Sequence, residues 1–264
     1  MTTPLAVVTG ASSGIGYELA KQFAQNGFDL VIAAENNEIQ DAAAELRNQG
    51  RNVDAVQVDL SSEDGVEELN RRIQSTGRDI DAIAINAGIG ISGDFVRGTR
   101  LDENLNVIDL NVRSSVHLAK RVLPRMVERQ KGRVLFTSSI AATMPGPFDA
   151  VYNASKAFIQ SFAQAIREEL KDTGVTVTAL MPGPTETDFF ERAGMQDTKV
   201  GVSKKDDPAD VAREGYEAMM AGKDHVVAGS FKNTMQAMAA HVLPDTKLAE
   251  MHREQAEPGS AYDK

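Results

Sequence analysis

Residues 5–25 read LAVVTGASSGIGYELAKQFAQ, and the two ends of this stretch have different periodicities. Residues 5–9 form a short apolar run, as buried strands do, whereas residues 17–25 carry apolar side chains three or four positions apart, as amphipathic helices do. Three glycines stand between them. The stretch therefore predicts a strand that passes through a tight glycine turn directly into a helix.

The same alternation of strand and helix continues along the chain. Six further apolar runs rich in Val and Ile lie at residues 29–33, 53–58, 82–85, 133–137, 175–180 and 225–227. Helical patterns such as residues 39–48 separate them. Unbroken apolar strands are typical of sheets covered on both faces. We therefore predict an α/β fold of the Rossmann type, a doubly wound and mostly parallel sheet of seven strands with helices on both faces.

The organisation of the chain indicates one unit with two irregular segments. No repeat, low-complexity tract or linker divides the sequence, so we expect residues 1–264 to form a single domain. Residues 182–207 contain two Pro and three Gly and break the alternation of strand and helix, and we expect about residues 184–207 to form the substrate loop, with a short mobile helix at Phe189 and Phe190. The tail after about Ala256 is polar, and we expect it to be frayed.

Composition excludes several classes of function. Lys and Arg number 28 against 38 Asp and Glu, a formal charge of -10, so the basic stripe of a nucleic-acid binder is missing. The chain has no Cys, which fits a reducing cytoplasm, and its four His show no metal-ligand spacing. No apolar run approaches the roughly 18 residues that span a membrane. We expect a cytoplasmic protein with no nucleic-acid, membrane or metal partner.

The glycine turn after the first strand predicts a dinucleotide site. Glycines let the backbone approach a pyrophosphate, and the free amides of a helix N-terminus attract its negative charge. The spacing is G-x-x-x-G-x-G, and such a turn can also have a purely structural role, ending one element and beginning the next. Its place at the first strand-to-helix junction favours phosphate binding. The expected cofactor contacts in this turn are Thr9, Gly10, Ser12, Ser13, Gly14, Ile15 and Gly16.

The end of the second strand bears on which dinucleotide binds. An acidic residue about 20 positions after the glycines favours a free ribose 2′-hydroxyl. Glu35 stands there, with no Lys or Arg nearby, so it can accept hydrogen bonds from the ribose and would repel a 2′-phosphate. Alternatively, Glu35 only opens the next helix, where a carboxylate also suits the dipole. We expect NAD(H) to be favoured over NADP(H).

Two further strand ends are candidate cofactor contacts. Asp59 and Leu60 follow the third strand, where the carboxylate can face the adenine amino group or can instead stand at the start of the following helix. Asn86, Ala87 and Gly88 follow the fourth strand. Their small side chains would let a cofactor lie flat, and Asn86 can tie neighbouring strand ends together.

A second group of residues has the chemistry of proton transfer. Tyr152 and Lys156 are four positions apart on a predicted helix and so share one face. An unperturbed Tyr has a pKa near 10, and a neighbouring ammonium and a nicotinium ring would lower it toward neutrality. Ser139, thirteen residues before Tyr152, can hold a carbonyl oxygen beside the phenol. The pair alone is typical of any helix face, and its combination with Ser139 and the glycine turn indicates a catalytic site.

These residues together resemble the classical short-chain dehydrogenase/reductase family. The resemblance runs in order from about residue 5 to 188 and covers the glycine turn, Asp59, Asn86-Ala87-Gly88, Asn111, Ser139, Tyr152, Lys156, Pro182-Gly183 and Thr187. It implies that Pro182, Gly183 and Thr187 contact the nicotinamide carboxamide.

The resemblance also implies how the chemistry is divided. It makes Tyr152 the catalytic acid or base, and it has Lys156 bind the nicotinamide ribose as well. Ser139 would orient the substrate, and Asn111 would hold a water in a proton relay from Lys156 to solvent.

Members of this family resemble one another in pairing through the helices that contain Asn111 and Tyr152. Residues 101–129 read as one long helix with more apolar positions than a sheet-facing stripe needs, and we expect Pro124 to bend it without ending it. A homotetramer is the expected assembly, with a homodimer as the alternative.

The function indicated is reversible hydride transfer between NAD(P) and a carbonyl or secondary alcohol. The expected substrate is neutral and moderately hydrophobic, because the candidate pocket walls are Ile89, Ile91, Met144, Phe148, Phe189 and Phe190. The alternative from another class is a dinucleotide-binding sensor or scaffold without catalysis. Dehalogenation or isomerisation on the same scaffold is disfavoured, because relatives with halide chemistry replace the glycines and the lysine that are present here.

Overall fold

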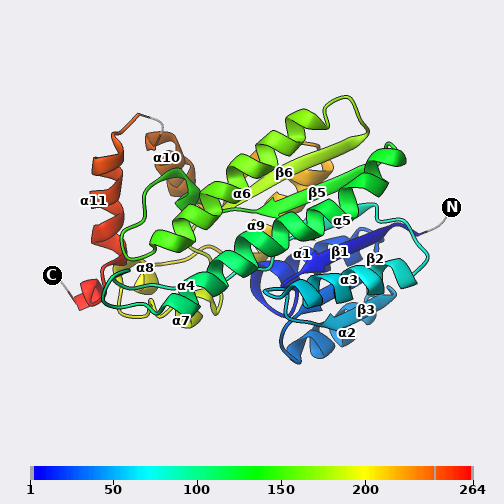
Figure 1. Ribbon diagram of the computed structural model, residues 1–264, viewed down its shortest axis with the longest axis horizontal. Helices are drawn as coiled ribbons and strands as arrows, with labels where there is room; N and C mark the ends of the chain where they lie inside the picture. The colour runs from blue at the N-terminus through cyan, green and yellow to red at the C-terminus, as the bar shows by residue number, and fades with distance from the viewer. Residues whose placement is uncertain (1–2, 241, 263–264) are drawn as a thin grey trace.

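The computed structural model describes residues 3–240 and 242–262, and its centre is one seven-stranded sheet (Figure 1). The strand order is β3-β2-β1-β4-β5-β6-β7, and every neighbouring pair is parallel. This confirms the predicted fold. The strands are β1 (Leu5–Thr9), β2 (Asp29–Ala34), β3 (Val53–Gln57), β4 (Ala82–Ile85), β5 (Gly132–Thr137), β6 (Val175–Pro182) and β7 (His225–Ala228).

Helices connect the strands. The chain runs from β1 outward to β3 and then crosses back to β4 on the other side of β1, so the switch point of the sheet lies between β1 and β4. Ligands of doubly wound sheets bind outside the carboxyl ends of the strands at such a switch point. Within the described residues, no helix is both long enough and apolar enough to cross a membrane. The α-helices are α1 (Gly14–Gln25), α2 (Glu38–Arg47), α3 (Glu63–Ser75), α4 (Leu101–Ile108), α5 (Ser114–Glu128), α6 (Ala150–Glu169), α7 (Phe189–Arg192), α8 (Lys199–Val202), α9 (Pro208–Met220), α10 (Phe231–Ala239) and α11 (Asp245–Ala256).

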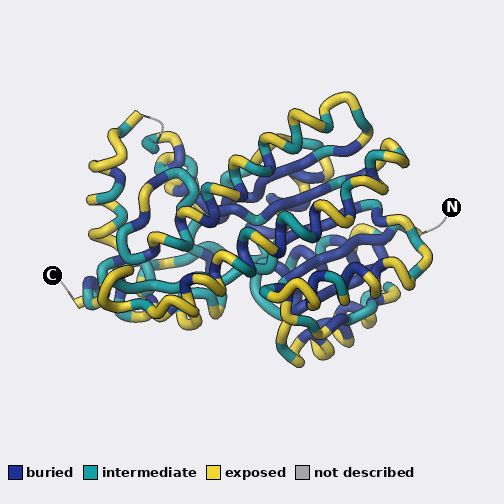
Figure 2. Tube along the Cα trace, in the orientation of Figure 1, coloured by how far each residue is buried: buried dark blue, intermediate teal, exposed yellow. Residues whose placement is uncertain are grey.

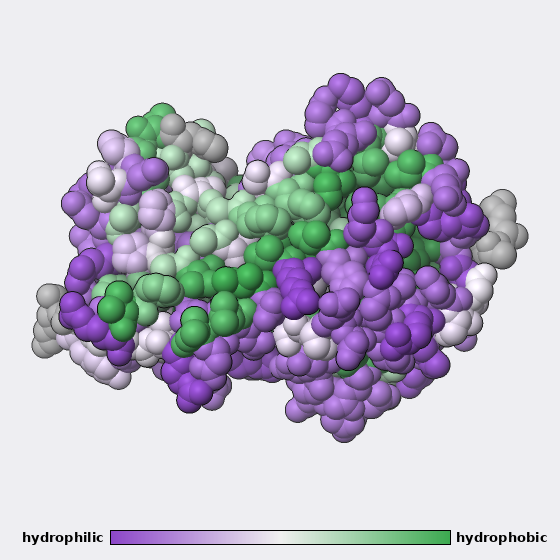
Figure 3. Space-filling view, in the orientation of Figure 1, coloured by the Kyte–Doolittle hydropathy of each residue, from purple (hydrophilic) through white to green (hydrophobic). Residues whose placement is uncertain are grey.

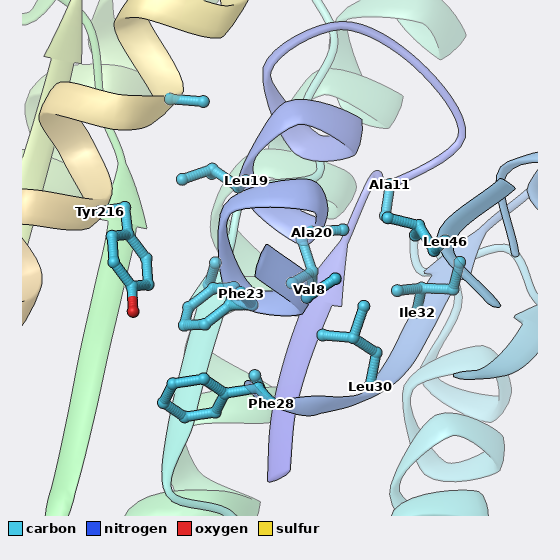
Figure 4. Close-up of a cluster of buried hydrophobic side chains, with 14 of the residues drawn as sticks. Val8, Ala11, Leu19, Ala20, Phe23, Phe28, Leu30, Ile32, Leu46 and Tyr216 are labelled. Atoms are coloured by element: carbon cyan, nitrogen blue, oxygen red, sulfur yellow. The ribbon is translucent and has the colours of Figure 1, made fainter. Parts of the chain in front are cut away.

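Two hydrophobic cores lie on opposite faces of the sheet, because successive residues of a strand point to opposite sides. Val8 of β1 packs with Phe23 of α1 and Tyr216 of α9 on one face (Figure 4). Val7 packs on the other face with helices α3, α5 and α6, for example with Leu118. Figure 2 shows the strands buried between these two layers.

The long helix expected over residues 101–129 is interrupted by a wider turn. A π-helical turn, Asp109–Arg113, separates α4 from α5 and contains Asn111. Such turns are rare and are frequent at functional sites. As predicted, Pro124 does not end the helix, since α5 continues to Glu128. The π turn itself leaves no signature in the hydrophobic pattern.

The described part of the tail, residues 257–262, makes ordered contacts with the segment around α8, where fraying was expected. Residues Ser260–Tyr262 form a short 3-10 turn, and Ser260 is buried. Its hydroxyl accepts a hydrogen bond from the Lys199 amide at 3.0 Å, and the Ala261 amide donates to the Asp197 carbonyl at 2.9 Å. The polar character of this tail therefore serves backbone pairing with the segment around α8.

The α1 side of the core depends on Phe23. Its ring is completely buried and makes edge-to-face contacts with Phe28 and Tyr216, with centroids 5.3 and 5.2 Å away. We expect Phe23→Ala to lower the free energy of unfolding by about 3–5 kcal/mol, because the cavity cannot fully collapse. The measurement is urea unfolding. Phe231→Ala is the control, since that side chain is 76% exposed, and it should change stability by less than about 0.5 kcal/mol. A similar loss in both variants would contradict this account of the core.

Candidate active site

A cavity of about 770 Å³ opens at the carboxyl ends of the strands, at the switch point between β1 and β4. This size is within the usual range of ligand sites. Three predicted site residues are not on its wall: Thr9, Asp59 and Asn111. The predicted site residues that do line it are Gly10, Ser12, Ser13, Gly14, Ile15, Gly16, Glu35, Leu60, Asn86, Ala87, Gly88, Ser139, Tyr152, Lys156, Pro182, Gly183 and Thr187.

The glycine turn has the shape that a pyrophosphate requires. Gly14 has a φ of +56°, a conformation that L residues rarely adopt. A Cβ on Gly16 would stand 1.9 Å from the Gly10 carbonyl oxygen, so no side chain fits there. Ser13 precedes α1 but its side chain does not cap the helix, which leaves first-turn amides free for an anion. The residues of this turn therefore fit a dinucleotide phosphate.

Thr9 and Asn86 support the turn from behind. The Thr9 hydroxyl accepts hydrogen bonds from the amides of Asn86 and Ala87, at 2.9 and 3.0 Å. The Asn86 side-chain amide donates to the Thr9 carbonyl at 3.1 Å, and its oxygen accepts from the Thr137 hydroxyl at 2.9 Å. The ends of β1, β4 and β5 are thereby tied together, as the sequence predicted for Asn86. Thr9 lies off the cavity wall because its side chain is committed to this network.

The two acidic candidates have different positions. Glu35 follows β2, is exposed and lines the cavity. Asp59 is exposed outside the cavity wall, and its carboxylate accepts a hydrogen bond from the Ser61 amide at 2.9 Å. That bond forms an Asx turn just before α3, whose N-terminus Ser62 caps. The alternative reading of Asp59, at the start of a helix, is the one that matches its contacts.

Ser139, Tyr152 and Lys156 meet on one side of the cavity. Ser139 follows β5, whereas Tyr152 and Lys156 share one face of α6, as their spacing predicted. The Lys156 ammonium donates to the Thr137 carbonyl at 2.9 Å and lies 5.8 Å from the centroid of the Tyr152 ring. Ser139 is buried, and its hydroxyl accepts from the Ala141 amide at 3.1 Å. These contacts fix both polar groups beside the phenol.

The electrostatics of this group differ from the sequence-based expectation. Burial raises the pKa of Tyr152 to about 12, and the negative charge of Asp149 adds to that rise while the Ser139 hydroxyl opposes it. Burial also lowers the pKa of Lys156 to about 8. The surrounding side chains therefore do not bring the pKa of Tyr152 toward neutrality, because desolvation outweighs the hydrogen bond with Ser139. They hold the phenol in its protonated form.

Asn111 is a buried neighbour of the site. Its side-chain amide donates to the Ile89 carbonyl and to the Ser155 hydroxyl, both at 2.9 Å, and its oxygen accepts from the Ile89 amide at 2.9 Å. The side chain thus connects the segment after β4 to α6. A Cβ on Gly88 would stand 3.1 Å from the Asn111 side-chain oxygen and 3.2 Å from the Lys156 nitrogen, so the two polar groups flank the same glycine.

Five of the six apolar residues predicted to form the substrate walls line the cavity, together with charged residues such as Arg192, Lys204 and Lys232. The predicted residues that line it are Ile89, Ile91, Met144, Phe189 and Phe190. The Phe189 ring covers the Tyr152 ring, with centroids 5.1 Å apart. Phe148 does not line the cavity, which corrects that expectation. Its φ of +69° accompanies a turn of the backbone, and its ring instead contacts the Arg253 guanidinium, whose central carbon lies 5.4 Å from the ring centroid.

Several polar cavity residues were not singled out from the sequence, and two of them lie near the start of α6. Asp149 and His252 both line the cavity. Asp149 had a usable signal, because it stands three positions before Tyr152 and so near the same helix face. His252 had none, because only the fold brings α11 beside the start of α6.

Comparison with known proteins shows the family to which the chain belongs. The chain matches the family model described as short chain dehydrogenase over residues 4–198. The oxidoreductase UcpA of Salmonella typhimurium is 32% identical over 220 residues, which are 83% of this chain and 81% of the relative.

Two solved structures are similar in fold. A short-chain dehydrogenase from Sphingobium yanoikuyae in complex with NADPH has a TM-score of 0.79 and 30% identity, over 85% of this chain and 87% of that one. A short chain dehydrogenase/reductase from Burkholderia phymatum in complex with NAD has a TM-score of 0.82 and 22% identity, over 97% of both chains.

The glycine turn fits a phosphate, and the buried Tyr152 phenol lines the same cavity at the switch point. Together they define an oxidoreductase that uses NAD(P). More narrowly, the chain belongs to the short-chain dehydrogenase family, as the sequence analysis predicted. It acts on CH–OH or C=O groups, and the reading as a sensor without catalysis is not favoured.

Gly14 offers a test of the dinucleotide site. Gly14 and Gly27 both have positive φ, but a Cβ on Gly14 would lie 2.9 Å from the Thr187 side chain, whereas one on Gly27 would touch nothing within 4 Å. Both Ala variants should lose about 1–2 kcal/mol of stability from the strained backbone. We expect only Gly14→Ala to weaken NADH and NADPH binding, by about tenfold or more, or at least 1.4 kcal/mol. Fluorescence titration measures this, and equal binding by the two variants would argue against a cofactor at the turn.

Proposed function

We propose that this enzyme reduces the carbonyl group of a neutral, moderately hydrophobic compound, or oxidises the corresponding alcohol, with Tyr152 as the proton donor or acceptor. The observation that carries the proposal is the meeting of Tyr152, Ser139 and Lys156 on one cavity wall. A bound nicotinamide supplies or accepts the hydride. The five apolar residues on the cavity wall, among them Phe189 beside Tyr152, support the substrate class.

The proton chemistry follows from the environment of each group. With its pKa raised to about 12, Tyr152 keeps its proton at neutral pH and can donate it to a substrate oxygen as negative charge develops there. The Ser139 hydroxyl is positioned to hold the same oxygen. Lys156, whose pKa is lowered to about 8, can return a proton to the phenolate. We propose that Asn111 positions the water that connects Lys156 to solvent, which its place beside Gly88 supports.

We propose that the cofactor extends from the glycine turn to β6. Gly10, Gly14 and Gly16 would carry its pyrophosphate, and Ala87 and Gly88 would let it pass flat over the end of β4. The nicotinamide carboxamide would contact the Pro182-Gly183 turn and Thr187, where the cavity wall supports it. In this arrangement the nicotinamide would lie next to Tyr152 and Lys156.

We propose a preference for NAD(H), which depends on Glu35. The side chain lines the cavity at the end of β2, and a carboxylate there accepts hydrogen bonds from ribose hydroxyls and repels a 2′-phosphate. The similar Sphingobium structure is a complex with NADPH, so this fold can also hold the phosphorylated cofactor. The charge at position 35 is therefore the point to test.

Tyr152→Phe tests the assigned proton transfer. The variant removes one hydroxyl and keeps the ring that packs on Phe189. We expect kcat/KM on a panel of ketones and secondary alcohols to fall by about 10²–10⁴-fold, while NADH affinity is kept. Tyr262→Phe is the control, because Tyr262 is exposed at the end of the chain, and it should retain full activity. Equal activity of Tyr152→Phe and wild type would refute the role, and cofactor binding with no turnover by wild type would favour the sensor.

Glu35→Arg tests the cofactor preference. We expect the ratio of the Kd for NADPH to the Kd for NADH to fall by about tenfold or more, because a charge-assisted hydrogen bond is gained where a repulsion was lost. Glu38→Arg makes the same charge change in the first turn of α2, and Glu38 does not line the cavity. That control should leave the ratio within about twofold, which is less than 0.5 kcal/mol. A shift of the same size in both variants would mean that long-range charge, not position 35, sets the preference.

We propose a homotetramer, or else a homodimer, assembled through the helices that contain Asn111 and Tyr152. Figure 3 shows a band of hydrophobic residues over α4, α5 and α6. Leu101 on α4 is 74% exposed and Phe158 on α6 is 42% exposed, and neither contributes to the two cores. Exposed apolar patches of this kind mark interaction sites.

We propose that residues 1–264 act as one domain, in which residues 184–207 form the substrate loop. The contact of Phe189, within that loop, with Tyr152 supports this division of labour. We propose a cytoplasmic location, which the absence of Cys supports, since disulfides are rare in that compartment.

A further inference from the structure

Asp149 and His252 form a pair at the substrate end of the cavity. Asp149 precedes α6 and is 5% exposed, and His252 lies on α11. The distance from His252 Nε2 to the Asp149 carboxylate is 3.7 Å. Both residues line the same cavity as Tyr152, and the charge of Asp149 is felt at Tyr152, whose pKa it raises. The pair is therefore close to the reacting atoms.

The Asp149 carboxylate has few partners for a buried group: the Ser92 hydroxyl, whose hydrogen bond lowers the pKa of Asp149, and His252. Asp149 occupies the N-cap position of α6, yet its side chain accepts no capping hydrogen bond. Asp207, at the same position of α9, does cap its helix by accepting from the Ala209 amide at 2.8 Å. Over residues 3–240 and 242–262, His252 is the one basic side chain paired with Asp149. Burial raises the pKa of Asp149 to about 7, which reflects the cost of an incompletely compensated charge.

The contacts of His252 determine what it presents to the cavity. Its Nδ1 lies 3.1 Å from the Pro147 carbonyl oxygen, and a carbonyl can only accept a hydrogen bond, so Nδ1 carries the proton. Burial lowers the pKa of His252, which keeps the ring neutral at pH 7. Nε2 is therefore an acceptor. It faces the Asp149 carboxyl group across a gap too long for a direct hydrogen bond. Above pH 7, where burial no longer keeps that group protonated, both sides of the gap are acceptors.

The backbone holds the two acceptors in place. Phe148 has a φ of +69°. Two consecutive residues of α11 contact the loop around it: His252 hydrogen-bonds to the Pro147 carbonyl, and the Arg253 guanidinium lies over the Phe148 ring. The Gly93 amide also donates to the Phe148 carbonyl at 2.7 Å. A site on such a fixed frame loses little entropy when a ligand group enters it.

We propose that Asp149 and His252 recognise a hydrogen-bond-donating substituent of the substrate, a hydroxyl or an ammonium, carried close to the reacting carbon. Two facing acceptors are satisfied by a donor and repel a carboxylate. The inference rests on the proposed oxidoreductase function and narrows its substrate to hydroxylated or aminated ketones and alcohols. In this account the apolar walls hold the carbon skeleton, and the pair sets its orientation.

A matched set of three alcohols tests this in the wild-type enzyme saturated with nicotinamide cofactor. 2-Butanol, 1,2-propanediol and 1-amino-2-propanol have equal numbers of non-hydrogen atoms and differ in one group, methyl, hydroxyl or ammonium. Binding is followed through the His252 ring signals in NMR titrations. We expect the diol or the amino alcohol to bind about tenfold or more tightly than 2-butanol, and the tighter of the two identifies the donor. Equal affinity for all three, including no binding by any, would overturn the proposal.

Asp149→Asn is the matching variant, because its amide can donate to Nε2 and close the gap without a change of shape. We expect the preference over 2-butanol to fall to about onefold, within 0.5 kcal/mol. Glu250→Gln removes a carboxylate from the exposed face of α11 and should leave the preference unchanged. An unchanged preference in Asp149→Asn would also overturn the proposal. The wild-type comparison stands even if a variant does not fold, and because the readout is binding, failure here differs from a lack of turnover.

Discussion

The hydrogen bonds of the Thr9 hydroxyl to two successive backbone amides at the end of β4 are the constraint on which the site depends. Parallel strands β1 and β4 pair at the switch point, where the helices after them leave toward opposite faces of the sheet. Without a tie, the two strand ends would be free to separate at the place where the cavity opens. Asn86 extends the tie to β5 through Thr137, whose carbonyl in turn accepts from Lys156. The glycine turn and the lysine are thus positioned by one continuous network.

Most of the fold could be predicted from the sequence, because its signals are local. Apolar runs such as residues 29–33 and the glycine turn report on neighbouring residues only, and all seven predicted strands are present. The spacing of Tyr152 and Lys156 was equally local, and it placed both on one face of α6. Periodicity is sufficient wherever one face of an element is buried.

The remaining features depend on contacts between distant segments. The π-helical turn at Asn111 leaves the spacing of hydrophobic residues unchanged, so the pattern of residues 101–129 does not reveal it. Asp59 forms a turn with Ser61 that competes with a ligand contact, and nothing in the sequence weighs one against the other. The raised pKa of Tyr152 reflects how deeply the ring is buried, and His252 gains its place only through the docking of α11. Such properties arise from tertiary packing, which a single sequence read by pattern does not contain.

The docking of the last residues beside α8 has a consequence for how the protein is made. During synthesis the N-terminus leaves the ribosome first, and segments fold as they emerge. The glycine turn and β1 to β4 are complete within the first third of the chain, whereas the far wall of the cavity awaits α11 and the hydrogen bond from Lys199 to Ser260. A nascent chain can therefore form the glycine turn for the pyrophosphate long before the substrate end of the cavity exists. A chain truncated before α11 would keep the glycine turn that receives the cofactor pyrophosphate but would lack part of the wall that contacts the substrate.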